Sequence, residues 1–153
     1  MGSRSGALTA LAPFGDARLL IDMSAYARSG HPSVEPEWEA AVRRGQLIVC
    51  PLFFVEALYS ARDTDDVRDL AAELGSLPFL PLSERTHEIV ADAFRELATR
   101  QSSYHRVPPP DALIAALAHE AGVGVLHYDA HYDRLAEVLD FESRWIASPG
   151  SLD

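Results

Sequence analysis

The segment VPPPDALIAALAHEAGVGVLHYD, residues 107–129, combines a complete helix with the strand that follows it, and it decides the fold class. Three prolines break any helix before them. A new helix is predicted from Asp111 to Glu120, and the glycines at 122 and 124 mark its exit. Its run ALIAALA, residues 112–118, is apolar on all sides, so this helix is expected to be buried. The apolar run 123–126 predicts a short buried strand of the kind found in parallel sheets.

The same alternation extends along the rest of the chain. Apolar runs predict further strands at residues 18–21, 47–50, 79–82 and 144–147, the third at a sheet edge because it contains a proline. Helices are predicted over residues 36–44, 51–62, 63–77, 84–104 and 132–139. Strands that alternate with helices indicate an α/β fold, with a mainly parallel central sheet covered on both faces. We therefore expect a three-layer α/β/α domain over residues 18–148, a poorly ordered N-terminal extension, 1–17, and a C-terminal tail, 149–153.

Length and composition exclude several classes of protein. The chain of 153 residues suffices for one domain, and 48% hydrophobic with 24% charged residues is the balance of a globular protein. No apolar run approaches the roughly 20 residues of a membrane span. The mild apolar run at residues 7–12 is broken by Pro13 and is too short for a secretory signal. A single cysteine, Cys50, cannot form an internal disulfide and fits a reducing compartment, so a cytoplasmic location is expected.

The formal net charge of −10 has two interpretations. It is either a solvated acidic surface or, in part, a pocket of carboxylates that a divalent metal would neutralise. All 13 basic residues are arginines. The absence of lysine and of a GxxxxGK[ST] loop argues against Walker-type phosphate sites and lysine-dependent phosphatases. A DNA-binding regulator is also disfavoured, because no basic stripe is present.

Three aspartates lie where strands end or a helix begins. Asp22 and Asp129 follow two predicted strands, and ligands bind at the carboxyl ends of strands in open parallel sheets. Aspartate also favours such positions for purely structural reasons, because it supports turns and caps. Asp111 opens the buried helix, where the helix dipole alone would favour a carboxylate.

Glu56 is the only charged residue in the run LFFVEALY, residues 52–59. On a helix it shares a face with Leu52, Val55 and Tyr59, so we expect it to be buried. A buried carboxylate is costly unless it pairs with an arginine or binds a metal, and both alternatives are open. If the four acids meet at one sheet edge they repel one another, and Mg²⁺ or Mn²⁺ would resolve that repulsion.

Four short motifs then occur in an order that resembles the PIN-domain ribonucleases, and in particular the VapC-type toxins of toxin–antitoxin pairs. They are residues 20–25 (LIDMSA), Glu56 early in the helix after the second strand, residues 109–118 (PPDALIAALA) and residues 125–133 (VLHYDAHYD). The resemblance extends from residue 18 to residue 147. It implies an endoribonuclease that cleaves RNA with a metal-activated water and needs no nucleophilic side chain. The implied ligands of one or two divalent ions are Asp22, Glu56, Asp111 and Asp129.

The resemblance has further implications for the site and for partners. Ser24 would hydrogen-bond a metal-bound water or a ligand carboxylate. The family also implies a homodimer and a small antitoxin protein whose C-terminal segment covers the acidic pocket. We expect the dimer to form partly through the apolar stripe of the helix at 84–104 or through the helices beside it.

One position departs from the family pattern. Many relatives carry an aspartate two residues after the fourth acid, where this chain has His131, expected at the rim of the site; Asp133 is a candidate substitute. In one alternative, His127, Asp129 and His131 form a zinc site instead, since alternate residues of an extended segment share a face. In another, the chain is a catalytically inactive PIN-like binding module, which the presence of all four acids argues against.

Overall fold

Four short parallel strands form the centre of the protein in a computed structural model, which describes residues 14–153. Leu20 pairs with Ile48 on one side and with Val125 on the other, so the strand that contains it is central. The order across the sheet is β2-β1-β3-β4. The strands are β1 (Leu19–Ile21), β2 (Leu47–Ile48), β3 (Gly124–His127) and β4 (Ser143–Trp145). Every residue of β1, β2 and β3 is buried, as continuous apolar runs in a doubly covered sheet require.

The helices begin and end at the signals that the sequence carries. Prolines occupy the first turns of α3 (Glu35–Arg43), α4 (Pro51–Tyr59) and α7 (Pro109–Ala121). The side chain of Asp63 caps α5 (Thr64–Gly75) by accepting a hydrogen bond from the backbone N–H of Asp66. Gly122, with φ of 71°, ends α7 in the left-handed conformation that favours glycine. The helices of residues 14–153 are α2 (Met23–Tyr26), α3 (Glu35–Arg43), α4 (Pro51–Tyr59), α5 (Thr64–Gly75), α6 (Thr86–Arg100), α7 (Pro109–Ala121) and α8 (His131–Leu135).

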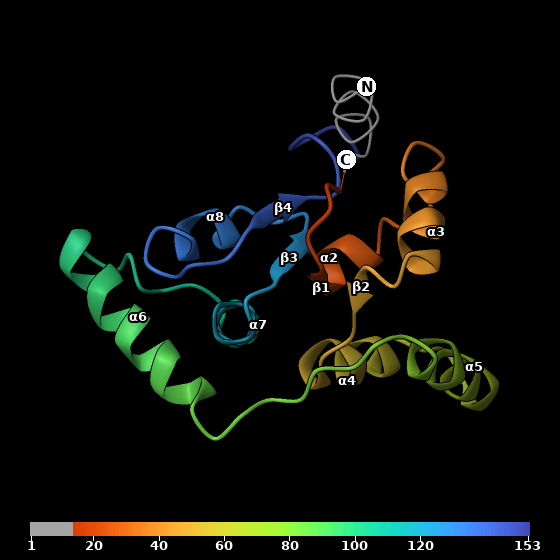
Figure 1. Ribbon diagram of the computed structural model, residues 1–153, viewed down its shortest axis with the longest axis horizontal. Coiled ribbons are helices and arrows are strands. Elements are labelled where there is room, and N and C mark those ends of the chain that lie inside the picture. Colours follow the sequence, from red (N-terminus) through yellow and green to blue (C-terminus); the bar gives the residue numbers. More distant parts are fainter. Residues whose placement is uncertain (1–13) are drawn as a thin grey trace, which may run out of the picture.

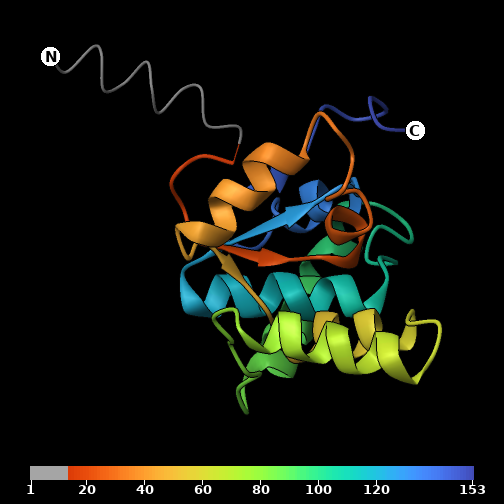
Figure 2. The same ribbon diagram turned by 90° about the vertical axis from the view of Figure 1, so that its right-hand side faces the viewer.

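Helices cover both faces of the sheet. Figure 1 shows α3 on one side of the strands and α7 on the other, with α6 packed outside α7. Figure 2 shows the strands between α3 and α7 from a direction at right angles. Helix α7 lies deepest, because six of its residues from Ala112 to Ala118 are buried. The three-layer α/β/α prediction is therefore confirmed.

One glycine is required where β3 enters the sheet. A Cβ on Gly124 would lie 2.7 Å from Cδ2 of Leu19 and 2.8 Å from the carbonyl oxygen of Glu142. The Leu19 methyl group could move aside, but the Glu142 carbonyl is backbone, so any side chain would push β3 away from the segment that leads into β4. This close approach matters for function, since β1 and β3 carry Asp22 and Asp129 at their ends.

Both expected terminal segments contact the domain where the structure describes them. Residues 1–13 of the expected extension lie outside the described residues. Phe14 is buried, and the buried side chain of Gln46 donates hydrogen bonds to the carbonyls of Phe14, Gly15 and Ala17. At the other end, the backbone N–H of Leu152 donates to the hydroxyl of Tyr128. The exact boundaries of the domain stay a prediction.

Two expected elements differ most from the observed ones. Residues 79–82 form only an isolated parallel bridge, Val49 to Phe79, because the partner segment leaves the sheet at Pro51, where α4 begins. The long helix is shorter than 84–104, and it packs against α7. Of its apolar residues, Ala93 and Leu97 are buried, Val90 and Phe94 are half-buried, and Ala98 is exposed. Part of the stripe remains open to solvent, and the homodimer through it stays a prediction. Among the described residues, no helix is long and apolar enough to cross a membrane.

Candidate metal centre

Asp22 is fixed at the carboxyl end of β1 by hydrogen bonds to both of its oxygens. It is 6% exposed, caps α2, and accepts from the backbone N–H and the hydroxyl of Ser24 through Oδ2. The hydroxyl of Tyr132 donates to Oδ1 at 2.7 Å. Ser24 Oγ in turn accepts from the backbone N–H of Tyr128 at 2.9 Å, just after β3. The Ser24 side chain therefore ties the ends of the two central strands together and orients the acid between them.

Asp111 lies in the first turn of α7 and faces this acid. Its side chain is 14% exposed. Its pKa is raised to about 7, first by burial and then by the negative charges of Asp22, Asp129 and Glu56, whereas His131 opposes the rise. The predicted convergence of the four acids is visible in this shift, because three carboxylates act on the fourth. Without a cation, Asp111 holds a proton up to near-neutral pH.

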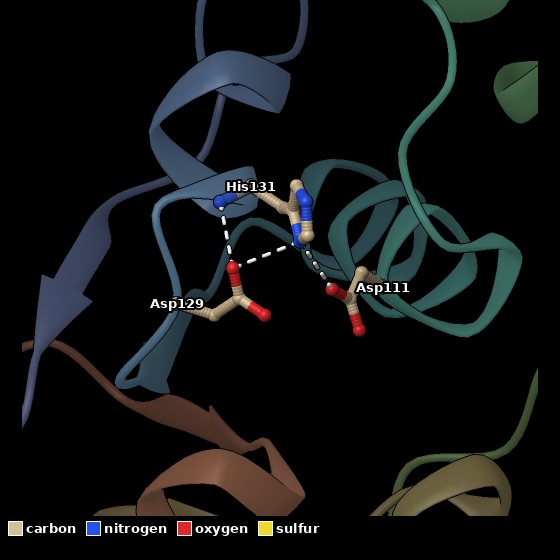
Figure 3. A group of neighbouring side chains, drawn as sticks. All are labelled: Asp111, Asp129 and His131. Carbon is tan, nitrogen blue, oxygen red and sulfur yellow. Dashed lines mark hydrogen bonds and ion pairs between the residues drawn. The ribbon is translucent and has the colours of Figure 1, made fainter.

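Asp129 and His131 complete the centre from the segment between β3 and α8, and Figure 3 shows His131 between the two aspartates. Oδ1 of Asp129 accepts from the backbone N–H of His131 at 3.0 Å and lies 2.8 Å from Nδ1 of the imidazole. The same Nδ1 lies 3.5 Å from Oδ2 of Asp111. One donor atom from each of the three residues lies within 4.8 Å of the others, which is close to the spacing around a single cation.

Glu56 is near the centre but is not buried, so that part of the sequence prediction is wrong. Helix α4 turns Phe53 and Ala57 inward, whereas Val55 is 64% and Tyr59 90% exposed, and Glu56 lies on the exposed side with them. Partial burial first, and then the charge of Asp22, raise its pKa. The ion pairs found among residues 14–153 do not include Glu56, so the arginine-pair alternative has no support.

A largely apolar groove opens beside Glu56. Tyr59 projects from α4 at its wall, and Leu82, 39% exposed, contributes from the segment before α6. Pro110, the residue before Asp111, also lines the groove. The complete lining is Pro51, Leu52, Val55, Glu56, Tyr59, Leu82 and Pro110. Apolar surface of this kind, bordered by charge, is typical of a binding site for a partner or a ligand.

His127 and Asp133 do not join the centre. His127 is fully buried: its Nδ1 accepts from the backbone N–H of Asp129, its Nε2 contacts Ser143 Oγ at 2.7 Å, and burial lowers its pKa to about 4. Asp133 accepts from Ser143 and from the indole N–H of Trp145, which ties α8 to β4. The zinc alternative with both histidines is therefore not favoured, and Asp133 is not placed to replace the missing aspartate.

Tyr132 was not predicted as a site residue, yet in the structure its hydroxyl contacts Asp22. Tyr132 is fully buried and stacks on the ring of His127, with centroids 4.8 Å apart. The available signal was its spacing: three residues after Asp129, it lies one turn along the short helix that follows and on its inner side. His131 was expected at the rim, yet the structure brings its Nδ1 between two carboxylates.

The sequence was compared with known protein families, and residues 16–138 match the PIN domain. The chain therefore belongs to the PIN domain family, and within it to the VapC-type proteins. Ribonuclease VapC18 of Mycobacterium tuberculosis is 36% identical over 133 residues, which cover 86% of this chain and 97% of that protein. Ribonuclease VapC21 of the same species is 31% identical over 135 residues, 88% of this chain and 97% of that one.

Solved structures agree with this fold. DNA-bound VapBC from Salmonella typhimurium contains a chain with a TM-score of 0.64 and 14% identity, covering 86% of this chain and all of that one. VapBC-5 from Mycobacterium tuberculosis, a member of the VapBC family of toxin–antitoxin systems, gives a TM-score of 0.57 at 21% identity. The match covers 83% of this chain and 97% of that one. At these identities the likeness concerns the fold alone.

Proposed function

We propose that the protein is an endoribonuclease that hydrolyses RNA phosphodiester bonds with Mg²⁺ or Mn²⁺, and that it is the toxin of a toxin–antitoxin pair. The observation that carries the proposal is the meeting of Asp22, Asp111 and Asp129 at one sheet edge, with Glu56 beside them, in a chain 36% identical to a ribonuclease. The raised pKa of Asp111 supports a cation at this place, because such a charge would relieve the repulsion among the carboxylates.

The roles of the residues follow from their positions. Asp22, Glu56, Asp111 and Asp129 are the proposed ligands of the divalent ion. When bound, such an ion lowers the pKa of a water and stabilises charge on the attacking and leaving oxygens of the phosphodiester. Ser24 and Tyr132 hold the Asp22 carboxylate in one orientation, so this ligand is positioned before any cation arrives. No serine, cysteine or threonine nucleophile is needed for this hydrolysis.

The partners belong to the same proposal. VapBC-5, one of the structural neighbours, is a member of a family of toxin–antitoxin systems, and we propose a small antitoxin protein as the partner of this chain. The apolar groove beside Glu56 supports this idea, because a segment lying there would also cover the acids. We propose a homodimer as well, formed partly through the exposed part of the apolar stripe of α6 or through the helices beside it. Action in the cytoplasm fits an RNA substrate and the single cysteine.

The proposal is tested by cleavage of a structured RNA. Purified protein should cut it in Mg²⁺ or Mn²⁺ and stop when EDTA is added. Asp111→Asn should lose cleavage while it keeps the circular dichroism spectrum of the wild type, whereas Asp69→Asn, at an exposed position on α5, should cleave normally. Full cleavage by Asp111→Asn would contradict the assigned site.

The toxin role needs a separate experiment in cells. Expression of the wild type should slow bacterial growth, and expression of the neighbouring small gene should restore it. Growth that is identical for wild type and Asp111→Asn at equal protein levels would contradict the toxin role, although the nuclease activity could survive that result.

A further inference from the structure

We infer that His131 is a nitrogen ligand of the divalent ion in this chain and that its imidazole moves the preference of the site from Mg²⁺ toward Mn²⁺. The inference rests on the proposed function for the presence of a cation. It goes beyond that function because the carboxylate set alone gives no reason to prefer one of these ions over the other.

The first argument is distance. Nδ1 of His131 lies 2.8 Å from Oδ1 of Asp129 and 3.5 Å from Oδ2 of Asp111. Ligand atoms at roughly 2.2 Å from a cation lie at most about 4.4 Å apart. The donor atoms of the three residues, all within 4.8 Å of one another, therefore need only small rotations to share one ion.

The second argument is the direction of the nitrogen. Nδ1 is inaccessible to solvent and is not aligned for a hydrogen bond with a carboxylate, although one carboxylate oxygen lies 2.8 Å away and another 3.5 Å away. The imidazole therefore directs a buried donor atom into the space between two carboxylates, where a shared cation would contact all three residues.

The third argument is the backbone that holds the ring there. The N–H of His131 donates to Oδ1 of Asp129, and this contact closes the turn that begins α8. The aspartate and the imidazole are thus oriented by one local turn. A change in the position of one therefore alters the position of the other.

The chemical consequence concerns ion preference. Mg²⁺ takes oxygen ligands almost exclusively, whereas imidazole suits transition-metal ions. An aspartate at the position of His131 would add one negative charge, which strengthens the binding of both ions, and one hard oxygen donor, which favours Mg²⁺ over Mn²⁺.

The decisive measurement is pulsed electron paramagnetic resonance of Mn²⁺ bound to the purified protein. Coupling of the electron spin to ¹⁴N reports an imidazole ligand directly and is independent of RNA cleavage. We expect this coupling in the wild type and its loss in His131→Asp and His131→Asn. His87→Asp makes the same exchange at an exposed position in the first turn of α6 and should keep the coupling.

Calorimetric titration adds a second readout. The ratio of the dissociation constants for Mg²⁺ and Mn²⁺ should fall at least tenfold in His131→Asp and stay unchanged in His87→Asp. Thermal melting in EDTA checks that each variant is folded. An unchanged ratio in folded His131→Asp, or the absence of ¹⁴N coupling in Mn²⁺-loaded wild type, overturns the inference.

RNA cleavage separates this inference from the function on which it rests. If the wild type cleaves RNA with Mn²⁺ but shows no ¹⁴N coupling, the ligand assignment is wrong and the nuclease stands. If the coupling is present but no metal supports cleavage of any RNA, the nuclease is wrong and the ligand assignment stands.

Discussion

Replacing Asp111 by asparagine should stabilise the metal-free protein, and the gain should increase with pH. The pKa of Asp111 is raised from 3.8 to about 7, mainly by burial and then by Asp22 and Asp129. The folded state therefore keeps a proton that the unfolded state releases between these two values. Stability from this group is present in full below pH 4 and is lost as pH rises to about 7.

The size of the effect follows from the same shift. Each pH unit between the two pKa values is worth about 1.4 kcal/mol, so the ionised Asp111 costs the folded protein up to about 4 kcal/mol above pH 7. Asparagine has nearly the same shape and no charge. The advantage of Asp111→Asn over wild type should therefore grow by about 2–3 kcal/mol between pH 5 and pH 8.

Urea unfolding in EDTA at both pH values measures this difference, with Asp69→Asn as the matched exposed control. Saturating Mg²⁺ or Mn²⁺ should reverse the order at pH 8, because only the wild type gains stability from the bound ion. The prediction is refuted if the gain in free energy of unfolding of Asp111→Asn is equal at pH 5 and pH 8, or if the variant is less stable than wild type at pH 8. Either result would show that ionised Asp111 does not destabilise the metal-free protein.

Three further predictions concern single residues around the centre. Glu56→Gln should reduce RNA cleavage by about a hundredfold or more, on the order expected for loss of a catalytic charge. Its free energy of unfolding in EDTA should stay within about 0.5 kcal/mol of wild type, because the side chain is exposed. A larger loss of stability would show that Glu56 has a structural role. Tyr132→Phe removes the donor to Asp22 Oδ1 and should destabilise the protein by about 1–3 kcal/mol while weakening metal binding in calorimetry; unchanged metal affinity would show that Ser24 alone orients Asp22. Gly124→Ala should lower the free energy of unfolding by at least about 2 kcal/mol, because its Cβ would meet Leu19 and the Glu142 carbonyl; a neutral result in thermal melting would show that β3 can shift without cost.

The parts of the fold that the sequence predicted are those where burial is local and continuous. The runs 19–21 and 123–126, which lead to Asp22 and Asp129, contain no polar side chain, so the strands and their burial could be recognised from neighbouring residues. The run between Asp111 and Glu120 is equally clear, because only a buried helix tolerates apolar residues on every face. These three features also predicted where the acids meet.

Glu56 shows where such reasoning stops. Helix α4 is apolar nearly all round, so its sequence does not say which face packs inward; the structure buries Phe53 and Ala57 and leaves Val55 and Tyr59 outside. Glu56 was predicted to be buried, and the structure leaves it exposed; its role as a ligand stays a prediction. His131 is a similar case, since its orientation depends on a turn closed by Asp129 that spacing alone does not define.

Occupation of the groove along α4 by the proposed antitoxin segment would affect both the activity and the stability of the folded protein. Val55, Tyr59 and Leu82 leave apolar surface open to water at the place where Glu56 borders the acids. A protein segment seated there would block the approach of RNA and, by mass action, also stabilise the folded chain. Departure of that segment would release an enzyme that is active and, at the same moment, more prone to unfold or to associate through its bare surface. A molecule without this segment would therefore cleave RNA only until it unfolds or associates. The apolar side chains that bind the segment would also set that time.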